Sequence, residues 1–135
     1  MANDKKLSQL REKIDAIDNQ LLALISERAG CAQQVAKVKQ EAGDTTYFRP
    51  EREAQVLRNI MEKNQGPLGN EDVARLFREI MSACLALEQP IKVAFLGPEG
   101  TFTQEAALKH FGHSAITVPM NAIDEVFREV DAGAA

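Results

Sequence analysis

Apolar residues recur at helical spacing along the first forty positions of the chain. Alternating steps of three and four residues connect Leu7, Leu10, Ile14, Ile17, Leu21, Leu24, Arg28, Cys31, Val35 and Val38. This pattern predicts one helix over residues 4–42, which at ~1.5 Å per residue would be about 55 Å long. A helix of that length exceeds the width of a small domain, so we expect it to need a partner along its length.

Arg28 is the one charged residue in this stripe. An unpaired guanidinium among apolar side chains would cost several kcal/mol. We therefore expect an anion to meet Arg28. The anion can be a carboxylate of the protein or a bound ligand, and the pattern alone leaves both open.

Two shorter helices are predicted next. Pro50 suits the first position of a helix, with Glu51 and Glu53 in its first turn, and Gly66-Pro67 should end it. Asn70 should cap a third helix that Pro90 closes. The inward face of this third helix is predicted to comprise Val73, Leu76, Phe77, Ile80, Met81, Cys84 and Leu87.

The pattern changes after Pro90. Short apolar runs over residues 91–96 and 115–118 predict strands, and they alternate with predicted helices over residues 103–111 and 122–130. This βαβα order is typical of a parallel α/β domain. About 45 residues is near the lower limit for a self-sufficient core. We therefore expect an all-α domain over residues 1–90, followed over residues 91–135 by an incomplete α/β domain.

Composition narrows the possible functions. The 135 residues carry a net charge of −4, which argues against nucleic-acid binding. The polar start and the lack of a long apolar run argue against a membrane protein. Cys31 and Cys84 lie in apolar helical patterns without metal-ligand spacing, so both are predicted to be reduced core residues of a cytoplasmic protein.

Several charged residues are predicted to share one face with Arg28. Lys39 follows it by about three helical turns, so the two cations could close on a small dianion. Arg11 precedes Arg28 by roughly 25 Å of helix, so it could join the same site only from a second subunit in an antiparallel two-fold pair. Glu88 falls on the inward face of the third helix by its spacing from Cys84. Further charges at the start of the second helix are Arg49, Arg52 and Glu53.

A structural interpretation competes with a binding site. Arg28 could form a buried ion pair with Glu88 or Glu53, while Arg11 and Lys39 are solvated at the helix edge. The chain would then be a non-catalytic helical dimerisation module. A third hypothesis is an anion-binding module without turnover.

The motifs together resemble a known family. Residues 10–15, 18, 22–28, 37–39 and 49–53 resemble the all-helical chorismate mutases, in the same order, within a stretch of about residues 5 to 89. Residues 93–103 resemble the start of a prephenate dehydratase domain. The whole chain thus resembles the N-terminal part of the bifunctional chorismate mutase/prephenate dehydratase enzymes.

This resemblance implies an intertwined homodimer of three-helix subunits. It also implies conversion of chorismate to prephenate, in phenylalanine biosynthesis, by an intramolecular Claisen rearrangement without a cofactor or metal. By analogy, Arg28 and the partner subunit's Arg11 hold the substrate carboxylates, and Lys39 donates to a carboxylate and to the ether oxygen. Glu53 accepts a hydrogen bond from the ring hydroxyl of the substrate, and Arg49 and Arg52 lie around this hydroxyl.

Three positions depart from one common version of the family pattern. Glu88 stands where some relatives have Gln, Cys84 where some have Ser, and Arg49 where some have Asp. A carboxylate must be protonated before it can donate a hydrogen bond to an ether oxygen. We therefore predict that Glu88 acts as a neutral acid. Residues that dehydratases contribute from later in their sequence are absent, so we expect neither dehydratase activity nor feedback by phenylalanine.

Overall fold

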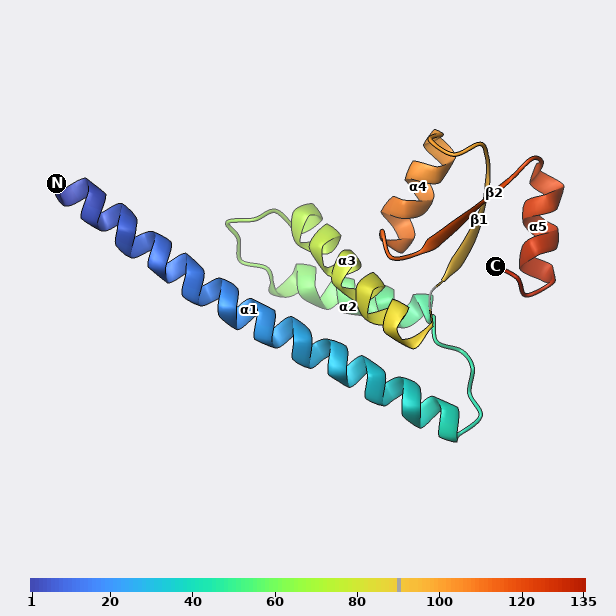
Figure 1. Ribbon diagram of the computed structural model, residues 1–135, viewed down its shortest axis with the longest axis horizontal. Helices are drawn as coiled ribbons and strands as arrows, with labels where there is room; N and C mark the ends of the chain where they lie inside the picture. The colour runs from blue at the N-terminus through green and yellow to red at the C-terminus, as the bar shows by residue number, and fades with distance from the viewer. Residues whose placement is uncertain (90) are drawn as a thin grey trace.

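The computed structural model describes residues 1–89 and 91–135, and within them the predicted order of elements is confirmed. The elements are α1 (Ala2–Glu41), α2 (Pro50–Lys63), α3 (Asn70–Glu88), β1 (Lys92–Leu96), α4 (Phe102–Phe111), β2 (Ile116–Met120) and α5 (Ile123–Asp131). Figure 1 shows α3 beside the C-terminal half of α1, with the N-terminal part of α1 projecting beyond it, and α2 packs on α3. The predicted end of the third helix at Pro90 lies outside the described residues.

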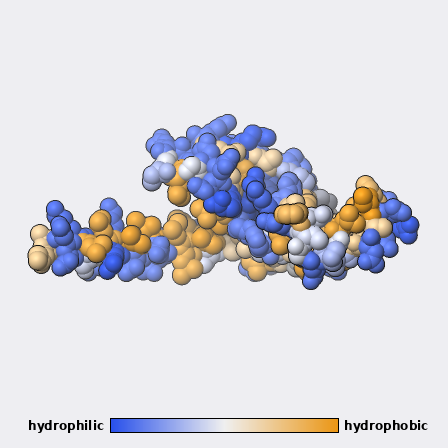
Figure 2. Space-filling view, turned by 90° about the horizontal axis from the view of Figure 1, so that it is seen from above, coloured by the Kyte–Doolittle hydropathy of each residue, from blue (hydrophilic) through white to orange (hydrophobic). Residues whose placement is uncertain are grey.

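Helix α1 leaves much of its apolar stripe uncovered within one chain. Leu10 is 58% exposed and Leu24 is 62% exposed, and apolar atoms follow the projecting part of the helix in Figure 2. Only near its C-terminal end does α1 bury a residue, the small Ala36, in the region where it packs on α3. None of the helices in the described ranges combines the length and the apolar composition needed to cross a membrane.

Helices α2 and α3 form a small core with α1, and two of their predicted boundaries need correction. Asn70 is the first residue of α3 rather than its cap, because Gly69 occupies the cap position. The Asn70 side chain instead accepts a hydrogen bond from Asn64 Nδ2 at 2.9 Å. Helix α2 ends at Lys63, before Gly66, because the Asn64 side chain accepts from the Gly66 amide and turns the chain earlier.

Burial differs from the prediction at three residues. Cys84 is buried, as predicted, but Cys31 is exposed, because the α1 surface around it faces a cavity rather than packed side chains. Leu76 and Leu87 are each about half exposed. The apolar stripe of α3 is therefore wider than the surface that its neighbours cover in a single chain.

The C-terminal unit begins as a parallel α/β fold. Strands β1 and β2 pair in parallel, with Lys92 opposite Ile116, and α4 and α5 lie on either side of the strands in Figure 1. Phe95 in β1 is only 3% exposed and forms the centre of this unit. The predicted βαβα order is therefore confirmed.

The turn after α4 docks the C-terminal unit onto α3. Gly112 in this turn is buried with φ of +84°, and a Cβ added there would collide with the side chain of Ser82 in α3. The Ser114 amide donates to Ser82 Oγ at 3.2 Å. His113 Nδ1 lies 2.7 Å from Glu79 Oε1, and the His113 amide donates to Glu79 Oε2. The close approach of the turn to α3 requires glycine at position 112.

Gly112→Ala should destabilise the chain more than a glycine substitution that adds strain alone. We expect a loss of about 3 kcal/mol in the free energy of unfolding, from the positive φ together with the collision with Ser82. Gly133 also has a positive φ, but a Cβ there meets nothing within 4 Å. Gly133→Ala should therefore cost only about 1 kcal/mol. Urea denaturation followed by circular dichroism would measure both, and equal losses would contradict the tight docking.

Candidate functional site

A cavity of about 370 Å³ lies between the C-terminal half of α1, the start of α2 and the end of α3. The loop over residues 42–49, which joins α1 to α2, forms part of its wall. Seven of the eight predicted site residues line this cavity; they are Arg28, Lys39, Arg49, Arg52, Glu53, Cys84 and Glu88. Residues from three separate helices thus surround one space.

Arg28 and Lys39 project from the same face of α1 into the cavity. Both are half-buried. In residues 1–89 and 91–135, no carboxylate lies within ion-pair distance of either cation. The ion pair of Arg28 with Glu88 or Glu53, which the structural interpretation expects, is therefore absent from the described chain.

Arg11 is the predicted site residue that this chain does not bring to the cavity. It is exposed on the projecting part of α1 and is absent from the cavity wall. A straight helix separates it from Arg28 by roughly 25 Å. Within a single chain Arg11 therefore cannot reach a small ligand held by Arg28.

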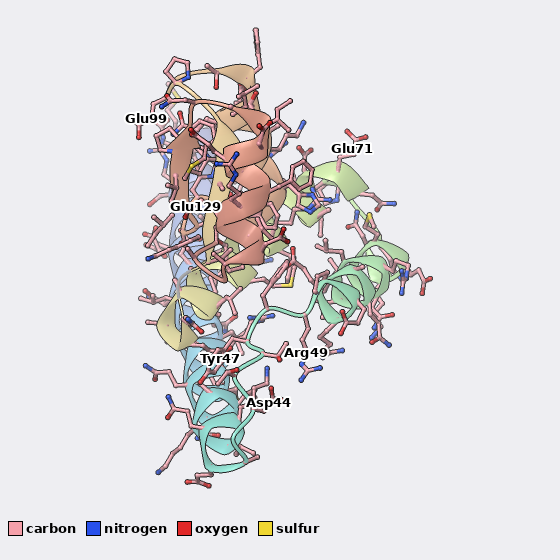
Figure 3. All side chains as sticks on the ribbon, turned by 90° about the vertical axis from the view of Figure 1, so that its right-hand side faces the viewer. Asp44, Tyr47, Arg49, Glu71, Glu99 and Glu129 are labelled. Carbon is pink, nitrogen blue, oxygen red and sulfur yellow. The ribbon has the colours of Figure 1, made fainter. Side chains whose placement is uncertain are left out.

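The loop over residues 42–49 is held by hydrogen bonds to Lys39 and within itself. Lys39 Nζ donates to the Thr46 carbonyl at 2.9 Å and lies 5.8 Å from the centre of the Tyr47 ring. The Asp44 carboxylate accepts from the Thr46 amide and from Arg49 Nη2, both at 2.9 Å. Figure 3 shows Asp44, Tyr47 and Arg49 gathered on this loop. The Thr46 amide, and to a lesser degree Arg49, keep the pKa of Asp44 below its usual value.

Arg49 is the one residue of this loop that was predicted to belong to the site. Tyr47 and Phe48 line the cavity, and Asp44 and Thr46 shape the backbone that carries them. One local signal was available, because an Asp side chain commonly accepts from the amide two residues later in a turn. That signal predicts a turn at Asp44 but not its position beside Lys39.

Two acids on the cavity wall are partly desolvated. Burial raises the pKa of Glu88, and the positive charge of Lys39 opposes that rise. Burial likewise raises the pKa of Glu53, against the charges of His110 and Arg78. Desolvation favours the neutral form of a carboxyl group. Glu88 can therefore hold its proton to a higher pH than an exposed glutamate.

The arrangement suits a small anionic ligand with polar groups along its length. A lysine ammonium has three N–H donors, and Lys39 uses one on Thr46. Arg28 and Lys39 can therefore donate to a ligand that enters between them. Protonated Glu88 would add one more donor at the α3 side of the cavity.

Two known protein families match this chain. The family described as chorismate mutase type II matches residues 10–89, and the family described as prephenate dehydratase matches residues 93–135. The first match covers more than half of the chain. The chain therefore belongs to the chorismate mutase type II family.

Individual relatives extend the comparison over the whole chain. It is 67% identical to a bifunctional chorismate mutase/prephenate dehydratase from Pseudomonas aeruginosa and 64% identical to one from Stutzerimonas stutzeri. Each alignment covers 99% of this chain but 38% of the relative, so the chain spans well under half the length of these proteins. The resemblance to the N-terminal part of the bifunctional enzymes is confirmed.

A solved structure matches the helical part. The chorismate mutase from Thermus thermophilus, in its Form II structure, aligns with a TM-score of 0.60 and 32% sequence identity. The alignment covers 62% of this chain and 94% of the Thermus chain. The helical part of the fold is therefore that of a chorismate mutase.

Proposed function

We propose that this chain is a chorismate mutase that converts chorismate to prephenate in aromatic amino acid biosynthesis. The observation that carries the proposal is the pair of half-buried cations, Arg28 and Lys39, facing one cavity without a carboxylate partner among the described residues. Chorismate is a dicarboxylate with an ether bridge, so it supplies the anions that these cations need. A cytoplasmic location stays a prediction.

The rearrangement needs no nucleophile from the protein. One C–O bond breaks and one C–C bond forms within a single molecule, with no net proton transfer. Catalysis then consists of holding the compact reactive conformer and stabilising charge on the departing ether oxygen. Arg28 binds a carboxylate, Lys39 donates to a carboxylate and to the ether oxygen, and Glu53 accepts from the ring hydroxyl. Arg49, Arg52 and Cys84 frame the substrate.

Glu88 is proposed to donate the second hydrogen bond to the ether oxygen. Its raised pKa supports this role, because only the protonated acid has a hydrogen to donate. The positive charge of Lys39 favours the ionised form of Glu88, which cannot donate a hydrogen bond. A substrate carboxylate that neutralises Lys39 would weaken this effect and favour the protonated form of Glu88.

The functional unit is proposed to be an intertwined homodimer. The uncovered stripe on α1, with Leu10, Ile14 and Leu24 all more than half exposed, supports a second copy of the helix as its partner. An antiparallel two-fold pairing would bring the partner subunit's Arg11 to the open side of the cavity. Arg11 would then hold the second substrate carboxylate.

Lys39→Ala should remove most of the mutase activity. We expect a loss on the order of 10²–10³ in kcat/KM, because a donor to the developing negative charge is removed. Loss of chorismate absorbance measures the rate. Lys37→Ala is the matched control, since Lys37 is an exposed lysine on the same helix and is absent from the cavity wall. Equal rates in the two variants would contradict the proposed site, and binding without product would favour the anion-binding module.

Mixing two inactive variants should restore part of the activity if each site spans two subunits. Arg11→Ala and Lys39→Ala each damage a different half of the site. In a statistical mixture, half of the dimers are heterodimers and each has one intact site, so about a quarter of wild-type activity should return. Subunits would be exchanged in mild denaturant and refolded together, with each variant refolded alone as the control. No recovery despite heterodimer formation would exclude Arg11 from a shared site.

The rate should fall as pH rises through the raised pKa of Glu88. Its protonated form is the active one, and that form is lost above its pKa. Glu88→Gln should flatten the decline, because an amide donates at every pH. Profiles of kcat/KM against pH would be compared with those of Glu62→Gln, a control at an exposed acid on α2. A wild-type rate independent of pH would disprove the neutral-acid role.

A further inference from the structure

Phe48 in the loop over residues 42–49 contacts a residue from the C-terminal unit. Its ring centre lies 5.8 Å from that of Phe111, the last residue of α4, with the ring planes at 59°. This is within the range for favourable aromatic pairs. Phe48 also lines the cavity beside Tyr47 and Arg49. The cavity loop therefore touches a segment that matches the prephenate dehydratase family.

The residues that follow Phe111 fix its position on α3. The three residues that follow it are tied to α3, by the close approach of Gly112 to Ser82 and by the hydrogen bonds of His113 and Ser114. Phe111 also shares a small buried space with Ser82 and other residues of α3. Its ring is thus held in place relative to the helix that carries Glu88.

The polar contacts that hold the loop lie at the surface. Its hydrogen bonds, from Lys39 to Thr46 and around Asp44, are exposed to solvent. Exposed hydrogen bonds contribute little to stability, because water competes for both partners. The contact between Phe48 and Phe111 adds an apolar anchor to these polar contacts.

The residue before Phe111 also contributes at the end of α4. Burial raises the pKa of Glu53 on the cavity wall, and the charge of His110, which precedes Phe111, opposes that rise. The His110 ring also packs edge-on against Phe111, with centres 4.7 Å apart. The last turn of α4 therefore lies beside the loop, through Phe111.

We propose that Phe111 is a positioning residue for the mutase cavity, which holds the loop over residues 42–49 through Phe48. The C-terminal segment then serves the mutase site directly. Phe111 does not touch the substrate; it fixes the loop to which Lys39 is bonded and that presents Tyr47 and Arg49. This inference rests on the proposed mutase function.

Phe111→Ala and Phe111→Leu in the full chain test the proposal. A loop that is free to shift should mainly raise KM, because the groups that bind the substrate are no longer held in position. We expect a loss in kcat/KM of roughly 10-fold for Ala and less for Leu. Phe102 begins the same helix and is 90% exposed, so Phe102→Ala and Phe102→Leu are matched controls. Both controls should leave kcat and KM unchanged.

Tyr47 gives a readout that does not depend on catalysis. It is the chain's one tyrosine, and the chain has no tryptophan, so tyrosine fluorescence reports on this loop alone. Quenching by acrylamide should increase in the order wild type, Phe111→Leu, Phe111→Ala, and stay unchanged in the Phe102 variants. If Phe111→Ala fails to fold by circular dichroism, the comparison of Phe111→Leu with Phe102→Leu decides.

The possible results distinguish the positioning role of Phe111 from the proposed mutase function. Unchanged quenching and unchanged KM in a folded Phe111 variant would overturn the positioning role. Quenching that rises without any change in KM would also overturn it, because the loop would then move without consequence for the site. Absence of chorismate turnover in the wild type would instead refute the proposed function, whatever the fluorescence of Tyr47 does.

Discussion

The length of α1 governs the arrangement of the other elements. A single helix of 40 residues carries an apolar stripe along its length, while α3, with 19 residues, packs on only part of it and α2 packs on α3. Burial of apolar surface stabilises the fold in proportion to the area removed from water. The uncovered apolar surface on the projecting part of α1 is therefore the feature that most favours association with a second chain. It also carries Arg11, so the same constraint that favours a dimer supplies a cation to the proposed site.

Charge balance in the cavity follows from this geometry. Arg28 and Lys39 need compensation that the described carboxylates do not give by direct pairing, while Glu53 and Glu88 are desolvated enough to have raised pKa values. The cavity wall therefore holds cations and acids that do not neutralise each other through short contacts. A dianion entering between the cations satisfies them without requiring either acid to ionise. This arrangement of charges favours an anionic ligand.

Periodicity and helix-ending residues were enough to predict the elements and to place Arg28, Lys39 and Glu88 at positions that line the cavity. Arg28 was found because it interrupts an apolar stripe, and Glu88 because it follows Cys84 by one turn. Tyr47 and Phe48 in the loop over residues 42–49 were not predicted, since the side chains of this loop follow no period and its position depends on contacts with Lys39 and Phe111. Errors at Asn70 and Cys31 have the same origin: cap choice and burial depend on neighbours in space, which a single helix pattern does not contain.

Helix α3 connects the two halves of the chain because it uses opposite faces for them. Met81, Cys84 and Glu88 face the cavity, whereas Glu79 and Ser82 face the turn after α4. Positions two apart on a helix, such as 79 and 81 or 82 and 84, point in nearly opposite directions. A rigid helix transmits a displacement from one face to the other. The docking of the C-terminal unit and the placement of Glu88 therefore depend on one rigid element, and the contact of Phe111 with Phe48 closes a second connection between the same two parts.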